Sequence, residues 1–128
     1  MEVKLETVAT RAAPAAIGPY SQAVAAGGFV FVSGQIPLEP ASGKLVPGPF
    51  AASVERALAN VDAILVAAGS GRDRVIKVTV YLTDLEKFSE LNEIYGRYFA
   101  DHRPARAVVE VSALPRGAEV EIEAVAAR

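Results

Sequence analysis

The 128-residue chain contains no cysteine, no tryptophan and only one histidine. Without cysteine there is no disulfide, no thiolate nucleophile, no iron–sulfur cluster and no cysteine-ligated zinc site. With one histidine there is no histidine pair for acid–base work on a phosphodiester, and no tryptophan is present to stack on bases. A reducing cytoplasm fits this composition.

The chain also lacks a strong charge imbalance and long apolar runs. Thirteen basic and fifteen acidic residues give a formal net charge of -2, so no broad positive field attracts a nucleic acid. No apolar run approaches the roughly 20 residues needed to cross a bilayer, and the opening MEVKLETVATRAA lacks the apolar stretch of a secretory signal. We expect a cytoplasmic protein that binds neither nucleic acid nor membrane.

What the chain does contain is ample apolar material for one core. Hydrophobic residues make up 52% of the sequence, and the length of 128 residues is that of a common domain, so we expect a single domain over residues 1–128. Apolar spacings of three and four predict a helix over residues 51–68 and a second helix ending near Asp101, which a capping box of Thr83 and Glu86 opens. Alternation and turn residues predict strands over residues 4–8, 21–25, 29–33, 75–82, 105–111 and 119–126, and a loop over 36–49.

This order of elements favours an α+β domain whose two helices cover one face of a mixed sheet. We expect the helices to cover the strand residues Ile76, Val80, Val109 and Ile122. If they do, Lys77, Arg106 and Glu121 share the helix-free face. Taken alone, such a face is equally well explained as a polar surface exposed to solvent.

Three segments carry a family resemblance: IGPYSQA from Ile17, SGQIP from Ser33, and PARAVVEVSALPRGAEVEIEAVA from Pro104. With TDLEKFSELNEIY from Thr83, they resemble the RidA family of reactive intermediate deaminases over nearly the whole chain. The resemblance implies a chorismate-mutase-like fold, a homotrimer with clefts between subunits, and no metal or organic cofactor. It also implies hydrolysis of 2-iminobutanoate and 2-iminopropanoate, which pyridoxal-phosphate dehydratases release, to 2-oxo acids and ammonia.

A 2-imino acid has a carboxylate beside an electrophilic C=N carbon, so its enzyme needs a carboxylate clamp and a group that positions water. Arg106 matches the clamp of the family, and a planar guanidinium can meet a carboxylate through two hydrogen bonds. Without the motif, a surface ion pair would explain this arginine. Glu121 matches the acidic residue that, by resemblance, holds the attacking water and transfers protons. Glu119 and Glu123 share its strand face, and only the motif selects Glu121.

The resemblance also implies substrate-binding positions around these two residues. Tyr20 matches an aromatic residue that lines the cleft, while Ser33 and Gly34 match a strand end whose polar groups face the ligand. A buried tyrosine with a bonded hydroxyl and an ordinary Ser-Gly turn are the alternatives.

Three further positions complete the expected pocket. Val108 stands where many members carry cysteine, and the contact there is implied to use the backbone carbonyl. Phe88 and Asn92 lie one helical turn apart and are placed to reach the pocket, although Phe88 is better explained as a core residue. His102 lies in the polar turn DHRP, and we expect it to face solvent.

Two other functions remain open at this point. One is an RNA-acting protein, an endoribonuclease or translation inhibitor, which the charge and the lack of stacking aromatics disfavour. The other is a non-enzymatic module that binds small acids, for which Arg106 alone would suffice. The side-chain preference of the pocket depends on residues 36–49 and on a neighbouring subunit.

Overall fold

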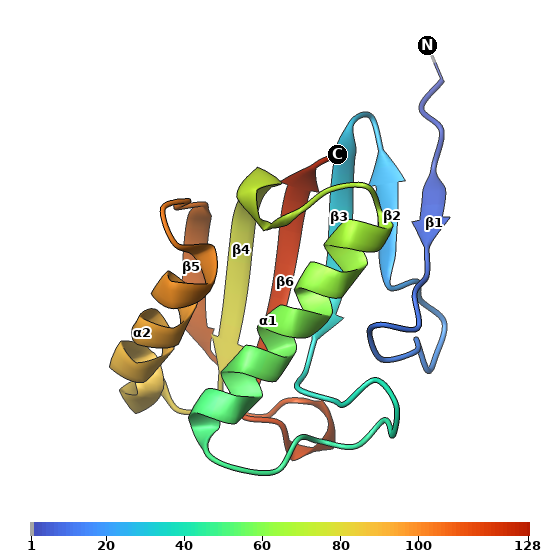
Figure 1. Ribbon diagram of the computed structural model, residues 1–128. Coiled ribbons are helices and arrows are strands. Elements are labelled where there is room, and N and C mark those ends of the chain that lie inside the picture. The colour runs from blue at the N-terminus through green and yellow to red at the C-terminus, as the bar shows by residue number, and fades with distance from the viewer. Residues whose placement is uncertain (1) are drawn as a thin grey trace.

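A six-stranded mixed sheet with both helices on one face forms the protein (Figure 1). The computed structural model describes residues 2–128. The spatial order of the strands is β1-β2-β3-β6-β4-β5, and every neighbouring pair is antiparallel except β4 and β5. The strands are β1 Glu6–Val8, β2 Ala23–Ala26, β3 Phe29–Gln35, β4 Val75–Leu82, β5 Ala105–Glu110 and β6 Val120–Ala127.

The first helix, α1 (Phe50–Ala67), lies across β3 and β6 and supplies much of the core. Its apolar residues recur at the predicted spacing, so one face is buried and the other is solvated. Gly69, with a φ of 82°, adopts the left-handed conformation that ends many helices. The fully buried side chains that meet between helix and sheet include Val30, Val54, Leu58, Ile64, Leu65, Val80 and Ile122.

The second helix, α2 (Phe88–Phe99), connects β4 to β5, and this crossover makes those two strands parallel. The predicted capping box was wrong. The Asp84 side chain, not that of Thr83, accepts a hydrogen bond from the Glu86 backbone N–H at 3.0 Å. Asp84 opens a short 3-10 turn, Leu85–Lys87, and α2 follows it.

A bulge in β4 overturns one predicted face assignment. The register with β6 shifts between Val75 and Lys77, so the chain gains one residue there. As a result Val75 and Val78 are both buried under the helices, whereas Ile76 is 43% exposed. Lys77 lies on the open face, as predicted, because it follows the extra residue.

Strand pairing also overturns the prediction for β5. Val80 of β4 is paired with both Val108 and Ile122, and residues paired across strands share a face. Val108 and, two positions before it, Arg106 therefore lie on the helix side, while Val109 is 43% exposed on the other side.

Glu121 precedes Ile122 and points to the open face, so Arg106 and Glu121 lie on opposite faces of the sheet. The sequence prediction was wrong on this point because it placed Val109 under the helices.

The open face of the sheet carries both apolar and ionisable side chains. Phe31 is 50% exposed there, and Tyr81 and Val109 are neighbours across β4 and β5. No helix among residues 2–128 covers this face. None of the helices in this part of the chain has the length and apolar character needed to span a membrane.

Candidate active site

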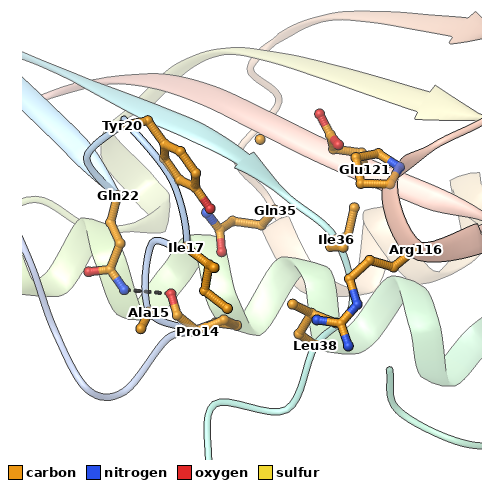
Figure 2. Close-up of a pocket in the computed structure, with 12 residues that line it drawn as sticks. Pro14, Ala15, Ile17, Tyr20, Gln22, Gln35, Ile36, Leu38, Arg116 and Glu121 are labelled. Carbon is orange, nitrogen blue, oxygen red and sulfur yellow. Dashed lines mark hydrogen bonds between the residues drawn. The ribbon is translucent and has the colours of Figure 1, made fainter. Parts of the chain in front are cut away.

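A cavity of about 380 Å³ lies where β3 ends and β6 begins. Three segments line it: the loop before β2, the end of β3 with the residues that follow, and the turn that leads into β6. Figure 2 shows their side chains around the cavity. The lining residues are Pro14, Ala15, Ile17, Tyr20, Gln22, Gly34, Gln35, Ile36, Leu38, Pro115, Arg116 and Glu121.

The Glu121 carboxylate lies directly against the backbone of Gly34. A Cβ at Gly34 would approach the Glu121 carboxyl carbon to 2.8 Å and would contact one carboxylate oxygen even more closely, so any other residue would force the Glu121 side chain to move. A bulge between Val32 and Gln35 in the pairing with β6 produces this approach. Bulges of this kind redirect side chains next to functional sites.

The position of Glu121 alters its acidity. Burial in the cavity raises the pKa of its carboxyl group, and the negative charge of Glu123 raises that pKa further. A carboxylate with a raised pKa binds a proton more readily, which suits a group that must take a proton from water and release it again. Among the three acidic residues of this strand region, only Glu121 lines the cavity.

The two rival carboxylates have other surroundings. Glu123 accepts a hydrogen bond from the Tyr81 hydroxyl, and this contact raises the pKa of the tyrosine. Glu119 is exposed. Sequence spacing did not distinguish the three, but their contacts do.

Tyr20 and Ser33 occupy different positions relative to the cavity. The half-exposed Tyr20 ring lines it, as expected, and its backbone N–H donates to the Gly18 carbonyl at 2.9 Å. Ser33 does not line it. Its hydroxyl donates to the Ser21 carbonyl at 2.6 Å, so the side chain ties the Tyr20 loop to β3.

Arg106 belongs to a second group of side chains, formed by β5 and α2. Its guanidinium carbon lies 4.8 Å from the centre of the Tyr95 ring and 5.6 Å from that of Phe88. Among residues 2–128 it forms no ion pair, so the simple explanation of a surface ion pair does not hold within the chain. Two aromatic faces thus orient a half-buried cation whose hydrogen-bond donors remain available.

Phe88 contributes to this second group instead of the core, since it is 39% exposed and stacks on Arg106. Asn92 is exposed on the same helix, and Val108 is half-buried against the core. None of these three residues lines the cavity with Glu121. The chain therefore divides the expected site residues. Tyr20, Gly34 and Glu121 line the cavity, whereas Arg106 and Phe88 form a separate group.

Sequence reasoning missed two residues of these groups. Tyr95 packs against Arg106, and burial raises its pKa to about 12 despite the nearby positive charge. Gln22 is buried and lines the cavity. An amide within the apolar stretch before β2 was the available signal for it, because buried amides need partners.

His102 departs from its predicted solvent-facing position. Its ring is half-buried, and its Nε2 atom lies 2.6 Å from the Val75 carbonyl oxygen, which makes it a link between the α2–β5 turn and β4.

The chain is similar to a described family and to individual proteins along almost its entire length. A family model described as endoribonuclease L-PSP matches residues 10–128. The 2-iminobutanoate/2-iminopropanoate deaminase of Bos taurus is 50% identical, covering 93% of this chain and 87% of its own.

Two solved structures extend the similarity to three dimensions. A crystal structure from Thermotoga maritima, described as an endoribonuclease candidate, has a TM-score of 0.94 at 53% identity and covers 96% of this chain and 97% of its own. E. coli TdcF with bound serine has a TM-score of 0.91 at 44% identity, with 96% of this chain and 98% of its own covered. These matches confirm the predicted α+β fold. The chain belongs to the RidA family, whose family model carries the endoribonuclease L-PSP description.

Proposed function

We propose that this protein is a cytoplasmic 2-iminobutanoate/2-iminopropanoate deaminase whose active site is completed between subunits of a homotrimer. One observation carries the proposal. The chain holds a carboxylate, Glu121, in a cavity and an arginine without an ion pair, Arg106, among aromatic rings, but it places them on opposite faces of the sheet.

Separation of these groups is what makes a second subunit necessary. Strand β4 lies between β5 and β6, so two strand spacings, roughly 10 Å, separate the backbones of Arg106 and Glu121. In a 2-imino acid the carboxylate and the C=N carbon are directly bonded neighbours, so both protein groups must approach the same small molecule. An Arg106 from one subunit placed over the Glu121 cavity of the next would satisfy that requirement.

The open face of the sheet is suited to such an assembly. Phe31 and Val109 expose apolar surface beside the ionisable groups of β4 and β6, and no helix of residues 2–128 covers them. Burial of that surface between subunits would be favourable.

The chemistry then follows from the two groups. Arg106 holds the substrate carboxylate through its planar pair of donors and orients the C=N carbon. Glu121 takes a proton from a water molecule as the water oxygen attacks that carbon, and it passes the proton to the nitrogen. In the resulting carbinolamine Glu121 takes the hydroxyl proton and delivers it to the nitrogen as the C–N bond breaks and the C=O bond forms. Ammonia and the 2-oxo acid are released, so one water is consumed for each imine.

Names of relatives support this proposal over the alternatives. The Bos taurus relative is named for the imine deaminase reaction, and the TdcF structure holds serine, a small amino acid with a carboxylate. The endoribonuclease description of the family keeps an RNA-acting function as the alternative. Binding of small acids without turnover is the second alternative.

A coupled assay tests the proposal. A pyridoxal-phosphate dehydratase generates iminobutanoate or iminopropanoate, and 2-oxo acid formation is followed with and without the protein. Faster release of 2-oxo acid supports deamination. If 2-oxo acid formation is not accelerated and the protein cleaves an RNA oligonucleotide, the RNA-acting function is supported. If it is not accelerated and the protein only binds a 2-oxo acid, the non-enzymatic binding function is supported.

A further inference from the structure

One end of the cavity holds the Glu121 carboxylate and is called the polar end. The other end carries mainly apolar side chains and is called the apolar end, although Gln22 and Arg116 also line the cavity away from Glu121. Glu121 lies at the polar end beside Gly34, whereas Pro14, Ile17 and Leu38 are grouped away from its carboxylate (Figure 2). The apolar end is formed by two loops and not by strands, because Pro14 and Ile17 precede β2 and Leu38 follows β3. Loops are mobile unless they are held, so the shape of this end depends on what fixes them.

One fixing residue is Asn60, which lies in the middle of α1 and has no exposed surface. Its side-chain amide donates to the Leu38 carbonyl at 3.0 Å and to the Ile36 carbonyl at 3.3 Å. Its side-chain oxygen accepts a hydrogen bond from Arg56 Nε at 3.1 Å. The two carbonyls belong to residues whose side chains line the cavity.

A buried asparagine in the middle of a helix costs stability, and its hydrogen bonds to the loop explain why it is there. Asparagine is a weaker helix former than alanine, and a buried amide is destabilising unless its hydrogen bonds are made. Asn60 makes them with the loop that follows β3, and therefore holds that loop to the helix.

The opposite wall is held in a similar way by Gln22. Its side-chain amide donates to the Pro14 carbonyl at 2.8 Å and to the Thr10 carbonyl at 3.0 Å, and its oxygen accepts from the Thr10 N–H at 2.6 Å. Both walls of the apolar end are thus fixed by buried amides before any ligand arrives, which reduces the ordering cost of binding.

We propose that Asn60 is a positioning residue that fixes Ile36 and Leu38 as a rigid wall for the apolar side chain of the substrate. It thereby sets the preference of the enzyme among imino acids by side-chain length. The inference rests on the proposed deaminase function and names a determinant of its substrate range. In this proposal only a longer side chain reaches the wall, and the side-chain hydrogen bonds of Asn60 join Arg56, Ile36 and Leu38, not Glu121 or Gly34.

The test uses Asn60→Asp, which keeps the size and the acceptor for Arg56 but removes both donors to the loop. With the imine of leucine we expect kcat/KM to fall about tenfold through KM, because a preorganised wall is lost. With iminopropanoate we expect a change of less than about twofold and an unaltered kcat, since this substrate does not reach the wall. Hydrogen exchange at the Val46 N–H, which donates to the Pro37 carbonyl at 2.9 Å, should become faster.

Arg56→Met is the matched control, because it removes the third partner of Asn60 and leaves both donors to the loop in place. It should retain the wild-type ratio of the two substrates. An equal loss with both substrates in Asn60→Asp, or an unchanged ratio, would overturn the inference. If Asn60→Asp does not fold, Asn60→Ser, which keeps a single donor, replaces it. The same ratio of kcat/KM for the two substrates is then measured.

Failure of the deaminase function itself would be visible separately. Calorimetry with pyruvate and 4-methyl-2-oxopentanoate measures the same discrimination without turnover. A wild-type protein that deaminates neither imine contradicts the proposed function, whereas the ratio of the two dissociation constants in Asn60→Asp still decides the role of Asn60.

Discussion

The Glu121 carboxylate rests on Gly34 so closely that a side chain at position 34 would displace it. Two features of the sheet create this contact: the bulge near the end of β3 and the side-chain alternation of β6. The backbone of one strand therefore sets the position of the carboxylate on the next. A small change at Gly34 is expected to act on catalysis through Glu121.

Gly34→Ala should lower kcat by about 10²-fold or more, because the new methyl group displaces a general acid–base carboxylate. Steady-state kinetics in the coupled assay measures the effect. Gly96→Ala is the control, since a Cβ at Gly96 meets nothing within 4 Å and alanine favours a helix. Equal activity in the two variants would show that the close contact has no catalytic role.

Glu121→Gln should separate catalysis from binding. Glutamine keeps the size but cannot take a proton at neutral pH, so turnover should fall about 10²–10⁴-fold after subtraction of spontaneous hydrolysis. Binding of a 2-oxo acid, measured by calorimetry, should survive. Glu119→Gln, at an exposed position, should change turnover only weakly. A larger loss of turnover in Glu119→Gln than in Glu121→Gln would show that Glu121 is not the acid–base group.

The raised pKa of Glu121 predicts the pH dependence of activity. The carboxylate works as a base only when ionised, so activity should be lost as pH falls through a value above the ordinary 4.5. Glu123→Gln removes the negative charge that contributes to the raised pKa of Glu121. The loss of activity on the acidic side of the pH profile should therefore move to lower pH. If the acidic side of the pH profile does not move, Glu123 does not contribute to the raised pKa of Glu121.

The same shift has a consequence for stability. The pKa of Glu121 is higher in the folded state, so its contribution to stability is present below the unfolded-state pKa and is lost as pH rises through the folded-state value. At pH 7 Glu121→Gln should therefore unfold at an equal or higher temperature than the wild type, with the difference disappearing in acid. Calorimetric melting at both pH values measures it, and a lower Tm at pH 7 would contradict this sign.

Arg106→Lys should lower catalytic efficiency although it keeps the positive charge. A lysine ammonium lacks the planar pair of donors and the stacking that Tyr95 and Phe88 give the guanidinium. Loss of a charged hydrogen bond, about 1.5–3 kcal/mol, corresponds to roughly tenfold or more in kcat/KM. Near-normal efficiency in the lysine variant would count against the carboxylate clamp.

Phe31→Asp should dissociate the oligomer. It places a charge in the middle of the open sheet face, which in the proposed trimer is buried between subunits. Val66→Asp is the matched control, because Val66 is a similarly exposed apolar residue on α1. Analytical ultracentrifugation should show a trimer for the control and smaller species for Phe31→Asp. Identical oligomers would place the interface elsewhere.

The sequence predicts the elements well because periodicity and turn residues are local signals. The strand over residues 75–82 has its predicted bounds, and α1 begins and ends within one residue of the expected positions. The faces of the strands were less predictable. The bulge that exposes Ile76 and the pairing that puts Arg106 under α2 depend on contacts between strands, which alternation along one strand does not contain.

For the site, motifs supplied the residues but not their arrangement. Glu121 and Tyr20 were named together with Arg106, yet only the first two line the cavity. The apolar stretch around Gln22 indicates a buried amide that needs partners, but the loops that Gln22 and Asn60 hold were not predictable, because each binds backbone carbonyls that any sequence would offer. Such contacts become visible only in three dimensions.

Subunit complementation tests the shared active site most directly. Arg106→Lys and Glu121→Gln are each strongly impaired in the proposed mechanism, but a mixed oligomer contains sites that combine a wild-type Arg106 from one subunit with a wild-type Glu121 from its neighbour. Co-expression of the two variants with different tags, followed by purification through both tags, gives mixed trimers. In every mixed trimer, of either stoichiometry, one of the three interfaces joins a wild-type Arg106 to a wild-type Glu121, so about one third of the sites in the purified sample should be complete and active. Recovery of deaminase activity toward that fraction is the predicted result, and mixed oligomers that stay as inactive as either variant alone would contradict a site shared between subunits.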